Sequence, residues 1–268
     1  MKIEKTLLGL KNQKEKALIV YITAGDPNLE ATEELVYVID KAGADIIELG
    51  IPFSDPLADG VTIQHASQRA LKNEVNIPKI LSTIKRIREK TSIPIALMGY
   101  YNPIYCYGLE SLVMDSKKAG VDGFIVPDLP FEESKEFLSI AEKEELELIS
   151  FLAPTSTAER IASIVQNARG FIYCVSVTGV TGIRKEFSMK IAEMIKKIRL
   201  YTDLPLAVGF GISNPEQAQE ASKYADAVIV GSAVVRLIEE SEGDLTKMLP
   251  SVGIFVSSLK EGITRERG

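Results

Sequence analysis

The sequence predicts an α/β fold, a (β/α)8 or TIM barrel with an extra N-terminal helix. Eight short apolar segments alternate with amphipathic segments along the whole chain. Several of the apolar segments contain almost no polar residues, which is typical of strands that are covered on both faces. Eight strand–helix units in about 250 residues also match the size of such a barrel.

The elements follow one another in a regular order. The expected strands are residues 18–23, 45–49, 95–98, 123–126, 147–151, 171–175, 206–209 and 227–230. Segments 29–41 and 77–90 repeat apolar residues at intervals of three or four, as amphipathic helices do. Residues 1–10 form the extra helix, and residues 232–267 hold the last helical segments. The turn residues Gly43 and Gly120 recur before two strands and suit the left-handed end of a helix.

An open, doubly wound sheet is the alternative fold. It usually has fewer strands and often carries a glycine-rich dinucleotide loop after the first strand. Here the first expected strand ends in Thr23-Ala24-Gly25-Asp26-Pro27, which indicates a turn and a helix start. No Gly/Ser-rich or charged linker divides the chain, so we expect one barrel domain spanning residues 1–268.

Composition excludes several classes of function. The net charge of −6 argues against nucleic acid as a partner. No apolar run approaches the roughly 20 residues of a membrane helix, and no apolar signal core follows the N-terminus, so we expect a cytoplasmic protein without a membrane partner. Two distant cysteines, Cys106 and Cys174, and a single histidine, His65, predict neither a disulfide nor a metal site.

The strand and loop from residue 46 to residue 60 are the most informative segment. In a barrel the active site lies at the C-terminal ends of the strands. Side chains alternate along a strand, so Glu48 points into the barrel if Ile46 does. A buried charge is costly, which makes Glu48 a candidate catalytic residue. The alternative is a structural glutamate paired with a lysine or an arginine.

Asp59 is the second candidate, at the other end of the same loop. It directly precedes Gly60 and an apolar-periodic segment, so it could instead be the N-cap of a helix. The loop between the two carboxylates is longer and more polar than the two to six residues usual for a βα connection. That length favours a functional loop, and it carries Pro52, Ser54, Asp55 and Pro56.

Glycine turns after the last two strands predict a phosphate site. The seventh strand ends in Gly209-Phe210-Gly211, and the eighth is followed by Gly231-Ser232. Turns of this kind that open helices offer free backbone N–H groups to an anion. The loops after strands seven and eight are the common phosphate site of this architecture. Taken alone, each motif could be an ordinary tight turn.

Two further loops could serve the same site. Residues 176–187 contain two glycines and two threonines, which suits either a lid that closes over a substrate or an ordinary surface loop. Residues 100–108 are rich in tyrosine and contain a proline. They could line an apolar pocket or form a contact surface for another protein.

Five segments together resemble the tryptophan synthase alpha subunit family. They are residues 24–27, the long segment 48–60, residues 178–182, residues 209–213 and residues 231–233. The resemblance runs in order from about residue 17 to about residue 240. It implies a lyase that cleaves indole-3-glycerol phosphate to indole and glyceraldehyde 3-phosphate in tryptophan biosynthesis.

The resemblance also implies roles for individual residues. Glu48 and Asp59 would be the acid–base pair, and Thr181 would belong to the lid. The phosphate would be held at Gly182, Gly211, Gly231 and Ser232. The indole ring would lie against Tyr21, Tyr100 and Phe210, where Tyr21 stands in place of the phenylalanine of many family members.

The same resemblance implies a partner and no cofactor in this chain. Pyridoxal phosphate would be carried by a beta subunit, in an alpha2beta2 assembly. Contacts with that subunit would fall on Asp55, Pro56, residues 102–108 including Asn102, and Pro130. Two rival functions remain at this point: another phosphosugar barrel, such as an isomerase or an indole-glycerol-phosphate synthase, and a regulatory binding subunit without turnover.

Overall fold

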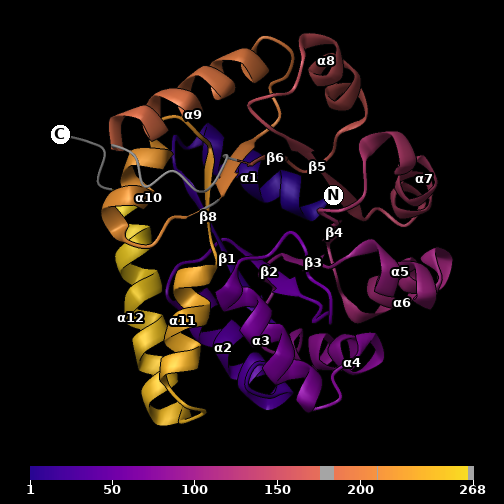
Figure 1. Ribbon diagram of the computed structural model, residues 1–268, viewed down its shortest axis with the longest axis vertical. Helices are drawn as coiled ribbons and strands as arrows, with labels where there is room; N and C mark the ends of the chain where they lie inside the picture. Colours follow the sequence, from indigo (N-terminus) through magenta and orange to yellow (C-terminus); the bar gives the residue numbers. More distant parts are fainter. Residues whose placement is uncertain (176–183, 210, 265–268) are drawn as a thin grey trace.

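Eight parallel strands form a closed barrel in the order β1 to β8, and helices surround it (Figure 1). The structure is a computed structural model that describes residues 1–175, 184–209 and 211–264. The strands are β1 (Ala17–Thr23), β2 (Ile46–Gly50), β3 (Ile95–Met98), β4 (Gly123–Ile125), β5 (Glu147–Leu152), β6 (Ile172–Val175), β7 (Leu206–Gly209) and β8 (Ala227–Val230). The predicted barrel is confirmed, and the bounds differ from the expected ones by at most one residue at either end.

The helices follow the expected alternation, with some connections holding two. They are α1 (Lys2–Asn12), α2 (Leu29–Lys41), α3 (Val61–Lys72), α4 (Ile77–Ile87), α5 (Tyr101–Tyr107), α6 (Leu109–Ala119), α7 (Lys135–Lys143), α8 (Ala158–Asn167), α9 (Arg184–Arg199), α10 (Pro215–Ser222), α11 (Ser232–Glu240) and α12 (Leu245–Thr264), with a 3-10 turn η1 (Phe131–Glu133) before α7. None of the helices in the described ranges is long and apolar enough to cross a membrane.

Helix α4 is shorter than its pattern predicts. It ends at Ile87, after which the Arg88 guanidinium donates to the backbone oxygens of Gly120 and Ile93 at 2.8 and 2.5 Å. The two glycine turns are confirmed, with φ of +97° at Gly43 and +91° at Gly120. An L side chain is strained in that conformation, so glycine is the favoured residue at both turns.

Alternation along the strands separates the core into an inner and an outer layer. Ile46 packs inside the barrel with Ile19 and Ala96, whereas Ile47 and Leu49 pack outside it against the helices. The inner layer fills the barrel with side chains, as expected for this architecture. The outer layer uses the apolar faces of helices such as α2 and α4, which contact each other along the rim.

Helix α1 closes the N-terminal end of the barrel. Its buried residues Ile3 and Leu7 belong to the inner core cluster, and Figure 1 shows α1 inside the ring of helices. Glu147, at the start of β5, accepts the backbone N–H groups of Ile3 and Glu4, both at 2.9 Å. These N–H groups have no partner within the helix, so the carboxylate caps α1. The opposite, C-terminal end of the barrel is not covered by α1, and the candidate site lies there.

Candidate active site

Glu48 lies inside the barrel near the C-terminal end of β2. Its neighbours on the strand, Ile47 and Leu49, face the helices, which confirms the direction that alternation predicts. The side chain is 1% exposed, and Oε1 accepts no hydrogen bond from the described residues. Burial raises the pKa of Glu48 to about 8. The unpaired oxygen argues against the structural alternative, in which Glu48 forms an ion pair with a lysine or an arginine.

Asp59 does not cap the helix that follows it. The N-cap of α3 is Gly60, and no side-chain hydrogen bond caps this end of the helix among the described residues. The Asp59 carboxyl instead meets the Tyr100 hydroxyl, which in turn accepts the Ala58 N–H at 2.9 Å. Burial raises the pKa of Asp59 to about 6, and the hydrogen bond from Tyr100 opposes that shift. The capping interpretation is therefore wrong, and the carboxyl is held by a tyrosine instead.

Tyr21 joins the two carboxylates into one site. It stands opposite Glu48 in the β1–β2 register and is buried. Burial first, and then the charges of Asp59 and Glu48, raise the pKa of Tyr21 far above its usual range. Its hydroxyl lies 3.2 Å from Thr23 Oγ1, and a Cβ at Gly50 would approach it to 2.2 Å. Only glycine at position 50 therefore leaves room for the tyrosine.

Tyr173 completes this group and was missed from the sequence. It lies on β6, is buried, and has a pKa raised by burial and by the charges of Glu48 and Asp59. Its ring stacks on Phe151 with the centroids 4.9 Å apart. The signal was present, because alternation points Tyr173 into the barrel if Phe171 points inward. The predicted barrel order also places β6 across from β2, so the position of Tyr173 could have been inferred from the sequence.

The start of α11 forms a candidate anion site next to Tyr21 and Glu48. Helix α11 begins at Ser232, and its N-cap is Gly231, which has no side chain to cap the first N–H groups. A Cβ at Gly231 would lie 3.3 Å from Cβ of Tyr21, so this helix end adjoins the tyrosine beside Glu48. Gly211 has φ of +72°, and, apart from its own chain neighbours, no atom of the described residues lies within 4 Å of the place where a Cβ would stand. Free N–H groups at a helix start attract an anion.

Three candidate residues cannot be placed. Thr181, Gly182 and Phe210 lie outside the described residues, as does most of the expected lid. His65 is exposed on α3, with Nδ1 3.6 Å from Glu239 Oε1. The described residues contain no group of three or more His, Cys, Asp and Glu side chains that could hold a metal ion.

The expected partner contacts adjoin one another at the mouth of the barrel. Asp55 and Asn102 are exposed, and Leu57, two residues after Asp55, is 95% exposed. The Ala58–Tyr100 hydrogen bond ties the loop after β2 to the start of α5. The N–H of Tyr101 donates to Asp128 at 2.9 Å, which ties α5 to the loop that carries Pro130. Three segments far apart in the sequence thus share one surface.

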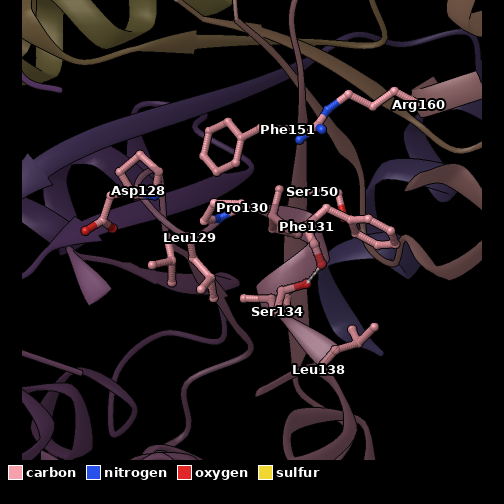
Figure 2. A pocket seen from close by; sticks show the side chains of 13 residues that line it. Asp128, Leu129, Pro130, Phe131, Ser134, Leu138, Ser150, Phe151 and Arg160 are labelled. Atoms are coloured by element: carbon pink, nitrogen blue, oxygen red, sulfur yellow. Dashed lines mark hydrogen bonds between the residues drawn. The ribbon is translucent and has the colours of Figure 1, made fainter. Parts of the chain in front are cut away.

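A cavity of about 260 Å³ opens beside this surface, between the ends of β4 and β5 (Figure 2). Its lining combines apolar side chains with Asp128, Ser134, Ser150 and Arg160. Neither carboxylate of the candidate pair lines it. The Phe151 ring borders the cavity and stacks on Tyr173, whose pKa is raised by burial and by both carboxylates. This cavity is therefore separate from the candidate carboxylates.

The fold is a closed (β/α)8 barrel. Its mouth holds a buried glutamate with a raised pKa, a second carboxyl and two tyrosines, an arrangement typical of barrel enzymes that use acid–base chemistry. Comparison with known proteins gives the family. Residues 7–264 match the family described as tryptophan synthase alpha chain.

The relatives agree over nearly the whole chain. The tryptophan synthase alpha chain of Geotalea uraniireducens (strain Rf4) is 51% identical over 262 residues, which cover 98% of this chain and 97% of that one. That of Caldanaerobacter subterraneus subsp. tengcongensis is 50% identical over 97% and 98%. The crystal structure of tryptophan synthase subunit alpha from Legionella pneumophila str. Paris has a TM-score of 0.91 at 38% identity, covering 98% of each chain. The chain belongs to the tryptophan synthase alpha chain family.

Members of this family cleave indole-3-glycerol phosphate to indole and glyceraldehyde 3-phosphate in tryptophan biosynthesis, and the chain is a lyase. The alpha chain carries no cofactor, because pyridoxal phosphate is in the beta subunit with which it forms a complex. The resemblance found in the sequence is thereby confirmed, and the two rival functions fall away.

Proposed function

We propose that this chain cleaves indole-3-glycerol phosphate with Glu48 and Asp59 as its acid–base pair. The observation that carries the proposal is the buried Glu48 carboxyl, with one oxygen unpaired and a pKa near 8, in electrostatic contact with the tyrosine that also faces Asp59. A carboxylic acid that stays protonated at neutral pH can donate a proton to carbon.

Glu48 acts first as an acid, when its carboxyl is protonated, and then as a base, when it is ionised. The protonated carboxyl donates its proton to the ring carbon that bears the glycerol chain, and the positive charge falls on the indole nitrogen. Asp59, ionised, accepts the indole N–H and stabilises that charge. The bond between ring and chain then breaks, its electron pair returns to the ring, and the hydroxyl proton passes to the Glu48 carboxylate as the aldehyde forms. Each such contribution is worth about 10²–10⁴-fold in rate.

The remaining site residues hold the substrate. The N–H groups at the start of α11, at Gly231 and Ser232, accept the phosphate, together with Gly211 and Gly182 from the neighbouring loops. Tyr21, Tyr100 and Phe210 surround the indole ring, and Thr181 belongs to the loop that covers it. Support for this arrangement comes from the closeness of Gly231 to Tyr21, and of Tyr21 to both carboxylates.

The same reasoning extends to assembly and compartment. The exposed surface formed by Asp55, Pro56, Asn102 and Pro130 takes the beta subunit, in an alpha2beta2 complex. We place the enzyme in the cytoplasm. The two cysteines support this, since Cys106 is exposed and free and Cys174 is buried and free, which is typical of a reducing compartment.

Replacement of Glu48 tests the proposal. The Glu48→Gln variant keeps the size of the side chain but cannot move a proton, so indole release from indole-3-glycerol phosphate should fall by about 10²–10⁴-fold. Glu147→Gln is the matched control, because Glu147 is equally buried but lies at the opposite end of the barrel. It should retain turnover within about threefold wherever circular dichroism shows both proteins folded. Near-native indole release by Glu48→Gln would falsify the assignment.

A further inference from the structure

Arg69 of α3 lies in an ion-pair cluster that the reaction does not explain. Its partner Asp26 follows β1, is 1% exposed, and has both carboxylate oxygens paired with the guanidinium, Nε to Oδ1 at 2.8 Å and Nη2 to Oδ2 at 2.9 Å. A two-point contact of this kind fixes the angle between its partners as well as their distance. The loop after β1 and the helix α3 are thus held in one relative orientation.

The same guanidinium also reaches a third segment. Nη1 of Arg69 donates to Oε1 of Glu239 at 2.6 Å, and Glu239 lies in the last turn of α11. The Asn73 amide at the end of α3 donates to the Pro27 oxygen at 2.5 Å, which fastens α3 a second time to the loop after β1. One side chain therefore joins the β1 loop, α3 and α11.

The joined helices carry the two halves of the proposed site. Helix α3 begins two residues after Asp59, and helix α11 begins at the proposed phosphate site, Gly231 and Ser232. The helices lie side by side next to β1 (Figure 1). Ala66 of α3 and Val235 of α11 pack together with Tyr21 in one small apolar cluster. Apolar packing is non-directional, so by itself it allows two helices to slide along each other. The hydrogen bonds of the guanidinium instead fix the relative position of α3 and α11.

We propose that Arg69 is a positioning residue for the cleavage: by joining α3 to α11 and to the β1 loop, it sets the distance between Asp59 and the phosphate-binding start of α11. The substrate spans these two groups, so its indole nitrogen meets Asp59 only when that distance is right. A displacement of about 1 Å costs on the order of 10²-fold in rate. The inference rests on the roles proposed above for Asp59 and α11.

Three variants separate positioning from folding. Arg69→Gln removes the ion pairs of Arg69 with Asp26 and with Glu239, but it leaves Asp26 buried without its charged partner, which risks the fold. Arg69→Lys keeps the charge and loses the two-point contact. Glu239→Gln removes the charge that pairs α11 with Arg69 and with His65, both on α3, and leaves the Asp26–Arg69 pair intact. Arg86→Gln is the matched control, because the Arg86–Glu33 ion pair, at 2.9 Å, joins α4 to α2 on the outer face of the barrel.

The measurements are kcat and KM for indole release by the complex with the beta subunit, together with the inhibition constant of inorganic phosphate. We expect kcat to fall by about 10- to 100-fold for Arg69→Lys and by at least threefold for Glu239→Gln. The inhibition constant of phosphate should stay within twofold, because the start of α11 itself is unchanged. Arg86→Gln should match the wild type in both quantities.

Two results would overturn the inference. One is a kcat for Arg69→Lys and Glu239→Gln within twofold of Arg86→Gln. The other is a phosphate inhibition constant that rises in step with the loss of kcat, since that pattern reports a generally loosened α11. Failure of the proposed function looks different, because Glu48→Gln would then keep its turnover whatever the Arg69 variants do.

Discussion

At the scale of single residues, Glu48 followed from the sequence and Asp59 only in part. A strand has a period of two, so the apolar Ile46, Ile47 and Leu49 fix the direction of the glutamate without any tertiary knowledge. Asp59 stands before a helix, where capping is the commoner role. What redirects its carboxyl is Tyr100, 41 positions along the chain, and no local pattern shows that contact.

The pH dependence of turnover should report both carboxyls. Burial raises the pKa of Asp59 to about 6 and that of Glu48 to about 8. Asp59 acts ionised, so kcat/KM should rise with pH through about 6. Glu48 must start protonated, so the value should fall again above about 8, giving a bell-shaped profile. Asp59→Asn should lose the acidic limb, and a profile flat from pH 5 to 9 would contradict both assignments.

At the scale of elements, the strands were predictable, but the long-range side-chain contacts that hold the ends of the helices were not. Strands covered on both faces are apolar throughout, which marks them in any sequence. Helix α1 was also expected, but its cap Glu147 is 144 positions away from Ile3. Arg69 went unnoticed for the same reason, because Glu239 is 170 positions from it. Helix α5 was read only as an aromatic segment, since its seven residues are too few to show a helical period.

The cap on α1 gives the fold a dependence on pH. Burial raises the pKa of Glu147 to about 7 from an ordinary 4.5, although the N–H groups of α1 lower it. The folded protein therefore holds this proton up to about pH 7, whereas the unfolded chain releases it near 4.5. Stability from this group is complete below about pH 4.5 and is lost as the pH rises through 7, by about 3 kcal/mol in total.

Urea unfolding of wild type and Glu147→Gln between pH 4.5 and 8 measures this contribution. The wild type should lose more free energy of unfolding across that range than the variant, because glutamine does not titrate. Glu48 and the other buried carboxyls titrate in both proteins, so the difference between the two curves isolates Glu147. Parallel curves would show that Glu147 keeps an ordinary pKa.

At the scale of the whole molecule, the barrel gives its two ends different tasks. The N-terminal end is closed by α1 and its cap, and the C-terminal end gathers the carboxylates, the start of α11 and the surface around Leu57. The architecture was predictable from the count and order of apolar segments. The grouping at the mouth was only partly so. The predicted closure places β8 beside β1, but the contact between Gly231 and Tyr21 depends on side-chain packing that no sequence pattern shows.

The surface at the mouth should control activation by the partner. Adding the beta subunit should raise the rate of indole release markedly above that of the isolated chain. Leu57→Glu places a charge on the 95% exposed leucine beside Asp55 and Pro56, and should weaken the activating association about tenfold or more. Ile254→Glu, on α12 and 72% exposed, is the matched control and should leave activation unchanged. Equal activation of both variants would show that the interface lies elsewhere on the chain. If the wild type were not activated at all, the proposed association would be wrong.

The closed end of the barrel also orders events in time. Helix α1 and the packed inner core close the N-terminal end of the barrel. Substrate must therefore reach Glu48, and products must leave it, through the C-terminal mouth. A second substrate molecule cannot enter until the previous aldehyde and indole have left. Product release then limits turnover as well as bond cleavage. In the complex proposed above, a beta subunit bound over the mouth would affect both substrate entry and product release.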